Sequence, residues 1–344
     1  MSERASDIQA FLDARGWGTA IRGPLAGDAS FRRYERLRVG YNAAVLMDAP
    51  PPEEDVAPFL RIARHLSALG YSAPDILADD PAAGLLLLED LGDDTYTKVL
   101  AERPGQEFQL YALAVDVLID LHGRATKDVL PPGLPSYDRD RLLTEALLLT
   151  DWFLPAATGE QTSPTLRQSY VAAWDACLQP VLEASQTLVL RDYHVDNLMW
   201  LPQRSGLARC GLLDFQDAVA GPAAYDLMSL LEDARRDLRP QLRDTMRARY
   251  VDGFAALNDD AAARNDFAAV YAILSAQRHA KVIGIFTRLS VRDAKPAYLV
   301  HIPRVWKLLE AALAHPALAP VSAWFETQVP VDLRTAPLHP TKAV

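Results

Sequence analysis

Two carboxylates and one amide lie close to the ends of short apolar segments in the second half of the chain. Asp192 and Asn197 are five residues apart in RDYHVDN (191–197), and Asp214 lies in the apolar segment CGLLDF (210–215). An amide oxygen and a carboxylate oxygen are hard ligands that suit Mg²⁺ beside phosphate oxygens. The other carboxylate, Asp192, could then take the proton of an acceptor hydroxyl while the metal ion neutralises charge on a transferred phosphoryl group.

Turn formation is the alternative explanation, because Asp and Asn are common in turns for purely local reasons. That explanation suffices for any one of these residues taken alone. The whole set, in this order and between apolar strands, favours a site for phosphoryl transfer.

A hairpin is expected to bring the three residues together. TLVL (187–190), LMWL (198–201) and CGLLDF (210–215) have the composition of strands, and PQRSGLAR (202–209) is typical of a turn. If the second and third strands pair, Asn197 and Asp214 lie at the same end of the hairpin.

The first ninety residues show mixed helix and strand patterns. Helices are predicted over 7–15 and 55–69, strands over 31–39 and 42–47, a hairpin over 75–90, and a glycine-containing loop over 21–30. From about residue 105 helical spacing dominates, with predicted helices over 108–121, 139–153, 164–182, 223–236, 240–257, 265–289 and 297–314. The fold class expected from this order is α+β.

Composition excludes several classes of protein. The chain has 344 residues, half of them hydrophobic, and a formal net charge of −10, which argues against a nucleic-acid partner. No apolar run is long enough for a membrane span, and the N-terminal segment lacks the apolar core of a signal peptide. Two cysteines fit a reducing compartment. We expect a cytoplasmic enzyme with no membrane association and no obligate protein partner.

The motifs resemble those of a known family. LRDYHVDN (190–197) resembles the H-x-D-x-x-x-x-N loop of aminoglycoside phosphotransferases and choline-kinase-like enzymes, and LLDF (212–215) resembles their I-D-F strand. The resemblance spans about residues 15–310. It implies that ATP and Mg²⁺ are the cofactors, that Asp192 is the catalytic base, and that Asn197 and Asp214 hold magnesium.

The resemblance also implies a protein-kinase-like fold of two lobes. We expect a nucleotide-binding N-lobe with an antiparallel sheet over 1–88, a hinge over 89–94, and a mainly helical C-lobe over 95–344. The C-lobe would contain the catalytic loop 190–197 and the metal-binding strand 211–217. Main-chain groups around Glu89 and Leu91, in the hinge, would bind adenine.

Two positions depart from the family pattern. Leu190 stands where the family has its first histidine, and Met47 stands where a phosphate-binding lysine is expected on the third strand. Arg32 and Arg33 follow the GDAS loop (27–30) and are the nearest cations that could replace that lysine; we favour Arg33. Within the loop itself, Gly27 permits close approach to the ATP phosphates and Ser30 offers donors to them.

The acceptor is expected to be a cell-wall amino sugar. LAGDASFRRYERL, LLLEDLGDDTY, LLDFQDAVAGPAAYDL and QRHAKVIGIFTRLS together resemble the bacterial kinases that phosphorylate the anomeric hydroxyl of N-acetylmuramate and N-acetylglucosamine in peptidoglycan recycling. Mixed donors and acceptors that suit a sugar lie near the motif residues, namely Arg191, His194, Gln216 and Asp217, with Arg278 further along the chain. A muramate carboxylate would need a cation, for which Arg191, His194 or Arg278 could serve.

Two other functions stay open on the sequence. An enzyme of the same fold could act on aminoglycosides, choline or another alcohol. A catalytically silent kinase-like module is the second, and the absent strand lysine is its main support.

Overall fold

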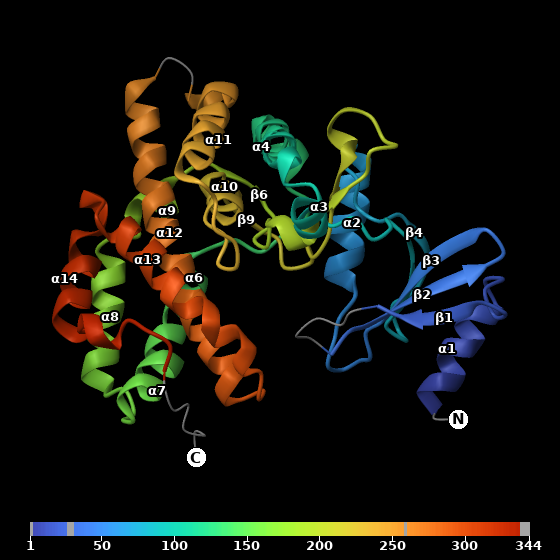
Figure 1. The fold of residues 1–344 in the computed structure, drawn as a ribbon, viewed down its shortest axis with the longest axis horizontal. Coiled ribbons are helices and arrows are strands. Elements are labelled where there is room, and N and C mark those ends of the chain that lie inside the picture. Colours follow the sequence, from blue (N-terminus) through green and yellow to red (C-terminus); the bar gives the residue numbers. More distant parts are fainter. Residues whose placement is uncertain (1–2, 26–30, 258–259, 338–344) are drawn as a thin grey trace. The chain divides into compact units, whose positions relative to one another are not determined.

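The computed structural model describes residues 3–25, 31–257 and 260–337 (Figure 1). The chain forms two compact units that interleave along the sequence. The first unit contains Met1–Val117, Pro131–Gly133 and Asp192–Ala218, and the second contains Leu118–Leu130, Leu134–Arg191 and Val219–Val344. The chain therefore passes from one unit to the other between Arg191 and Asp192. The lobe boundaries given above at residues 88 and 95 stay a prediction.

A five-stranded antiparallel sheet lies in the first unit. Its strands follow the order β1 (Ile21–Pro24), β2 (Arg33–Val39), β3 (Asn42–Asp48), β5 (Leu85–Glu89) and β4 (Ile76–Asp80). The predicted strands and the 75–90 hairpin are confirmed. The expectation of a loop over 21–30 was wrong for its first four residues, which pair with β2. The segment IRGP shows no clear alternation, and its proline fits only because β1 is an edge strand.

Helix α1 (Glu3–Asp13) covers one face of this sheet (Figure 1). Ile8, Phe11 and Leu12 pack with sheet residues that alternate along their strands, including Ala44 and Leu46. Because side chains of a strand alternate between faces, Val45 and Met47 belong to the opposite face. Helix α2 (Ala57–Ala68) also belongs to this unit and ends before Gly70, whose φ of 91° is accessible to glycine without strain.

The predicted hairpin of the motif region is confirmed. β7 (Leu198–Trp200) and β8 (Cys210–Leu212) pair antiparallel, with Leu198 opposite Leu212. The strand predicted over 187–190 is β6 (Gln186–Val189), which pairs with β9 (Val219–Pro222) in the second unit. β9 was missed because VAGP contains glycine and proline, which are rare in strands.

The second unit is mainly helical, and its longest element is α12 (Ala261–Val291). Helix α12 packs against α13 (Ile302–Leu313), α10 (Ala224–Leu231) and α6 (Arg139–Ala146) (Figure 1). Helix α3 (Tyr96–Glu102) belongs to the first unit, and α4 (Glu107–Gly123) is divided between the two units. The second unit also contains α5 (Thr126–Val129), α7 (Leu154–Thr158), α8 (Pro164–Asp175), α9 (Gln179–Glu183), α11 (Pro240–Gly253) and α14 (Ala319–Gln328).

Two predicted helices are interrupted. The helix predicted over 139–153 ends at Ala146 and is followed by a π-helical turn, η2 (Leu149–Phe153). The helix predicted over 164–182 is divided into α8 and α9, because Pro180 cannot continue a helix from the preceding turn. Among the helices that the structure describes, none is both long and apolar enough to cross a membrane.

Candidate active site

The start of the catalytic loop is held by a buried carboxylate. Asp226, on α10, accepts the backbone N–H groups of Leu190 over 2.7 Å and of Arg191 over 2.9 Å. Arg191 has a φ of 70°, in the left-handed region that a non-glycine residue rarely occupies. These two hydrogen bonds stabilise a backbone conformation that would otherwise be unfavourable. Asp226 thus fixes the turn that directly precedes Asp192, a role the sequence did not reveal because a helix cap explains an Asp at this position equally well.

The loop itself closes around the main-chain oxygen of Asp192. This oxygen accepts the N–H of His194 over 3.2 Å and the amide nitrogen of Asn197 over 3.0 Å. The Tyr193 hydroxyl donates to the carbonyl of Ala114 over 2.9 Å, which holds the loop to α4. Asp192 itself is half-buried. The hydrogen bonds of its main-chain oxygen and of Tyr193 fix the backbone of the loop that carries its carboxylate.

Asp214 is joined to this loop by two further hydrogen bonds. The N–H of Leu213 donates to the carbonyl of Asn197 over 2.9 Å, which continues the β7–β8 ladder by one step. The amide nitrogen of Asn197 lies 3.2 Å from Oδ2 of Asp214, and Gln216 Nε2 lies 2.6 Å from Oδ1. Asp214 has a φ of 57°, so the backbone turns sharply at this residue. The structure therefore brings Asp214, Asn197 and Gln216 into direct contact.

Phe215 fixes the position of this turn. Its ring stacks on Phe59 of α2 with centroids 5.0 Å apart and an interplanar angle of 28°. Phe215 is almost completely buried. An aromatic pair of this kind contributes about 0.5–1.5 kcal/mol beyond the area that it buries. The carboxylate of Asp214 is thereby set by a packed neighbour as well as by hydrogen bonds.

The donor set fits a magnesium ion. Because Asn197 uses its amide nitrogen as a donor to Asp192 and Asp214, its amide oxygen faces away from these acceptors, and within the described ranges no hydrogen bond uses that oxygen. An amide oxygen and a carboxylate are ligands that Mg²⁺ accepts when phosphate and water complete its octahedron. The part of the chain that the structure describes contains no cluster of three or more His, Cys, Asp or Glu residues suited to a metal. This combination fits a metal shared with a nucleotide.

The candidate adenine-binding residues lie at the end of β5. Glu89 closes the strand and forms an ion pair with Arg204. No hydrogen bond among the residues described uses the N–H or C=O of Leu91, whose side chain lies close to Gly211 of β8. The main-chain groups of Leu91 are thus suitable for a base that is recognised through its edge.

The candidate phosphate-binding cations occupy different surroundings. Arg32 forms an ion pair with Glu54 over 3.0 Å. Burial lowers the pKa of Arg32, but the hydrogen bond that Arg32 donates to Glu54, together with the charges and hydrogen bonding of Glu54 and Tyr34, raises the pKa overall. Arg33, the first residue of β2, is exposed, and Met47 is buried on β3. Gly27 and Ser30 lie outside the described residues.

The candidate sugar contacts are distributed over both units. His194 is buried and Asp217 is exposed, both within the first unit. His194 Nε2 lies 3.4 Å from the amide nitrogen of Asn197, so the imidazole packs against the metal-ligand candidate. Arg191 and Arg278 belong to the second unit, where Arg278 is only 5% exposed.

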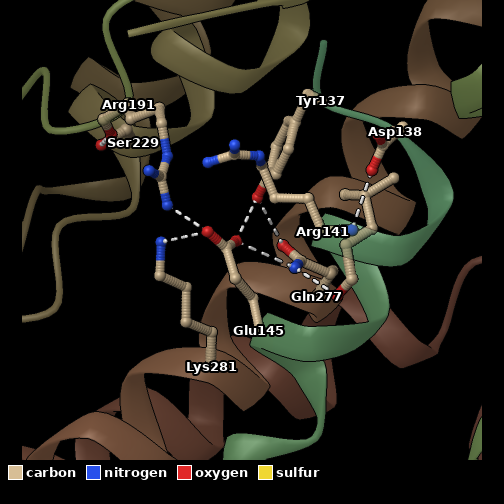
Figure 2. Close-up of polar contacts among 9 residues, drawn as sticks. Tyr137, Asp138, Arg141, Glu145, Arg191, Ser229, Gln277 and Lys281 are labelled. Atoms are coloured by element: carbon tan, nitrogen blue, oxygen red, sulfur yellow. Dashed lines mark hydrogen bonds and ion pairs between the residues drawn. The ribbon is translucent and has the colours of Figure 1, made fainter. Parts of the chain in front are cut away.

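Arg191 is part of a buried polar cluster that the sequence did not predict (Figure 2). Its guanidinium pairs with Oε1 of Glu145 on α6, and Nζ of Lys281 on α12 lies 3.2 Å from the same oxygen. The second oxygen, Oε2, accepts the Tyr137 hydroxyl over 2.5 Å and Gln277 Nε2 over 3.2 Å. The four partners come from three separate parts of the chain, with Gln277 and Lys281 both on α12, so sequence spacing alone could not group them around Glu145. The one local signal for the cluster is that Glu145 on α6 and Lys281 on α12 are charged residues that lie among apolar ones.

The cluster changes the ionisation of Glu145. Burial by itself would raise the pKa of this carboxyl, but Lys281, Arg191 and the hydrogen bonds from Tyr137 and Gln277 together bring the pKa below its usual range. Glu145 is therefore ionised at neutral pH, and it compensates charge on Arg191. The guanidinium that was a candidate for the acceptor is thus already engaged by a carboxylate of the chain.

Comparison with known proteins agrees with the motifs. A model of the phosphotransferase enzyme family matches residues 22–264. An N-acetylmuramate/N-acetylglucosamine kinase from Caulobacter vibrioides is 39% identical over 97% of this chain and 99% of its own length. A protein of the same name from Pseudomonas aeruginosa is 37% identical over 89% of each chain.

Among solved structures, a choline kinase from Streptococcus pneumoniae superposes with a TM-score of 0.62 at 13% identity, covering 92% of this chain and 99% of its own. This likeness confirms the predicted α+β, protein-kinase-like fold. Because the family model spans residues 22–264 of the 344 and the Caulobacter vibrioides relative matches almost the full length, the chain belongs to the phosphotransferase enzyme family.

Proposed function

We propose that this phosphotransferase is an ATP-dependent kinase that transfers a phosphoryl group to the anomeric hydroxyl of N-acetylmuramate and N-acetylglucosamine. The single observation that supports phosphoryl transfer is the contact of Asn197 with both Asp192 and Asp214. The choice of acceptor is supported by relatives that are named N-acetylmuramate/N-acetylglucosamine kinase and match this chain over most of its length.

In the proposed reaction Asp192 accepts the proton of the anomeric hydroxyl as its oxygen attacks the γ-phosphorus of ATP. A carboxylate held on a fixed backbone suits this role, because a general base must lie within hydrogen-bond reach of the proton that it takes. The two hydrogen bonds to the main-chain oxygen of Asp192 limit the motion of the loop.

Asn197, through its amide oxygen, and Asp214 would hold Mg²⁺. When bound, the ion would offset the negative charge of the phosphate oxygens. Gln216 keeps the Asp214 carboxylate in one orientation through its 2.6 Å hydrogen bond. The stack of Phe215 on Phe59 holds the backbone at Asp214.

The nucleotide contacts remain part of the proposal. Main-chain groups near Glu89 and Leu91 would bind adenine, and Gly27 and Ser30 would contact the phosphates. Arg33 is the cation proposed in place of the absent lysine, because Glu54 already neutralises Arg32. His194, Gln216 and Asp217 are proposed to contact hydroxyl groups of the sugar.

An acceptor panel tests this function. ADP release from Mg-ATP is measured with N-acetylmuramate, N-acetylglucosamine, kanamycin and choline at equal concentrations. The proposal predicts that kcat/KM for the two amino sugars exceeds that for kanamycin and choline by at least about 100-fold, since unsatisfied polar groups strongly disfavour the wrong acceptor. A preference for kanamycin or choline, or turnover of none of the four, would contradict it.

A further inference from the structure

The guanidinium of Arg36 joins strand β2 to the segment that follows β5. Its Nε lies 2.7 Å from Oδ2 of Asp90, and its Nη2 donates to Oδ1 of the same carboxylate over 3.0 Å. Nη2 also donates to the carbonyl oxygen of Gly92 over 3.1 Å, and Nη1 donates to Oδ1 of Asp93 over 2.7 Å. One side chain thus holds two carboxylates and one main-chain oxygen of the segment 90–93.

The register of the sheet explains how Arg36 reaches this segment. Arg36 lies opposite Val45 of β3, and Val45 lies opposite Leu88 of β5. Residues in one such row point to the same face of a sheet, so the Arg36 side chain extends across β3 toward the end of β5. This face is the one that α1 leaves uncovered, because the next residue, Leu37, belongs to the cluster that packs on α1.

The main contact of Arg36 is largely shielded from water. The side chains of Arg36 and Asp90 are 15% and 11% exposed, whereas that of Asp93 is 61% exposed. A mostly buried guanidinium that binds both oxygens of a carboxylate is held more firmly than an exposed ion pair. The pair of Arg36 with Asp90 therefore restrains the segment most, and the contact with Asp93 adds less.

Other hydrogen bonds fix the backbone on both sides of Leu91. Asp90 accepts the N–H of Gly92 over 3.0 Å through Oδ1, and the carbonyl of Asp94 accepts the N–H of Trp200 over 2.8 Å. Leu91 itself is half-buried, and in the part of the chain that the structure describes no hydrogen bond uses its N–H or C=O. A restrained segment with one unused donor and one unused acceptor suits the edge of a planar base.

We infer that Arg36 is a positioning residue for the nucleobase of ATP, because it holds the segment 90–93 in the conformation that presents the main-chain groups of Leu91. This inference rests on the proposed function, in which those groups bind adenine. A segment that is already ordered loses less conformational freedom when its ligand binds, so Arg36 increases affinity without touching the base. The residues involved all belong to the first unit.

Titration calorimetry of the full chain with Mg-ADP and with magnesium tripolyphosphate, which lacks a base, tests this role. Arg36→Met should raise the Kd for Mg-ADP by about tenfold, because the segment must then be ordered on binding. The Kd for tripolyphosphate should stay within about twofold, and kcat at saturating ATP should change by less than about threefold. Arg38→Met removes an exposed cation on the same face of β2 and, as the matched control, should leave all three values unchanged.

A second variant covers the case in which Arg36→Met fails to fold because Asp90 loses its counter-ion. Arg36→Met/Asp90→Asn removes both charges, and the asparagine oxygen can still accept the N–H of Gly92. Because the two side chains act as a unit, this double variant should bind Mg-ADP as weakly as Arg36→Met alone.

Two results would overturn the inference. One is a double variant that binds Mg-ADP as tightly as the unmodified protein, and the other is an equal loss of affinity for Mg-ADP and tripolyphosphate. The proposed function fails separately. An unmodified protein that binds Mg-ADP but phosphorylates neither amino sugar contradicts the proposed acceptor, while the calorimetry still measures the role of Arg36.

Discussion

The amide nitrogen of Asn197 lies 3.2 Å from Oδ2 of Asp214, although the two residues are 17 positions apart in the chain. The β7–β8 hairpin produces this contact, because Leu198 pairs with Leu212, so that Asn197, directly before β7, and Asp214, two residues after β8, lie at the same end of the hairpin. We propose that the amide oxygen of Asn197 and the carboxylate of Asp214 hold one magnesium ion. The effects expected for changes at Asp192 and Asp214 depend on this arrangement.

Replacement of Asp192 by asparagine should abolish chemistry and leave nucleotide binding intact. The amide keeps the shape of the carboxylate but cannot accept the proton, so kcat should fall by about 10²- to 10⁴-fold with little change in the KM for ATP. Steady-state kinetics with either amino sugar provide the measurement. Asp140→Asn, at an exposed position on α6, is the matched control and should retain full activity. Retention of more than a tenth of the kcat by Asp192→Asn would argue against Asp192 as the base.

Replacement of Asp214 by asparagine should weaken the binding of Mg²⁺ with ATP. The variant loses the charged ligand, so the stabilisation of the protein by Mg-ATP in thermal melting should decrease, while stabilisation by ATP in EDTA should stay as it is. Binding to the native state raises the melting temperature only to the extent that the ligand has affinity for that state. An undiminished response to Mg-ATP in Asp214→Asn would show that magnesium is held elsewhere.

Glu145→Gln should destabilise the protein and alter its acid stability. Removal of the charge leaves Arg191 and Lys281 without their common partner, which should lower the free energy of unfolding by about 3 kcal/mol at pH 7. The pKa of Glu145 is lowered in the folded state, so its contribution is present above the unfolded value of about 4.3 and is lost as the pH falls through the folded pKa.

Urea unfolding at several pH values tests this expectation. The difference between the unmodified protein and Glu145→Gln should be constant near neutral pH and should shrink at pH 4 and below. Glu310→Gln removes one partner of an exposed pair with Arg334 and should change the free energy of unfolding by less than about 1 kcal/mol. A Glu145 variant as stable as this control would mean that the cluster contributes nothing to folding.

His122 should make the protein less stable at acidic pH. Burial lowers the pKa of this histidine to about 3, and its Nδ1 lies 2.8 Å from the Tyr250 hydroxyl. The unfolded chain takes up a proton near pH 6.5 and the folded chain does not, so stability falls as the pH drops below about 6.5. The expected loss from this residue between pH 7 and pH 5 is about 2 kcal/mol.

His122→Gln should therefore reduce the pH dependence of the unfolding free energy by about 2 kcal/mol over that interval, whatever its effect at pH 7. Burial likewise lowers the pKa of His279, to about 4, so part of the slope should persist in the variant. Denaturant melts at pH 7 and pH 5 measure both slopes. An unchanged slope in His122→Gln would contradict the assignment.

Local patterns predicted the elements that present the site, and long-range contacts account for what was missed. The 198–215 hairpin was predicted from two short apolar segments on either side of a polar turn. In the structure this hairpin lies directly beside the contact between Asn197 and Asp214. β1 and β9 were not predicted, because IRGP and VAGP are strands only through their pairing with β2 and β6. Such pairing depends on partners elsewhere in the chain and leaves little local signal.

The side chains of the Glu145 cluster were also not predicted to meet, because their contacts join distant parts of the chain. Its members come from α6, the residue Tyr137 just before α6, α12 and the start of the catalytic loop, and a polar residue on a helix does not indicate its partner. Sequence reasoning therefore named Arg191 as a candidate sugar contact without its counter-ion. The two backbone N–H groups that Asp226 holds are likewise visible only in the fold.

The position of the new phosphate on the sugar tests the proposed function most directly. The protein is incubated with Mg-ATP and N-acetylmuramate, and the product is examined by phosphorus-detected NMR with coupling to the sugar protons. The proposed reaction gives a phosphate coupled to the proton on C1 and released by mild acid, and this product should be absent with Asp192→Asn. A phosphate on C6, or ATP consumed without any sugar phosphate, would contradict transfer to the anomeric hydroxyl.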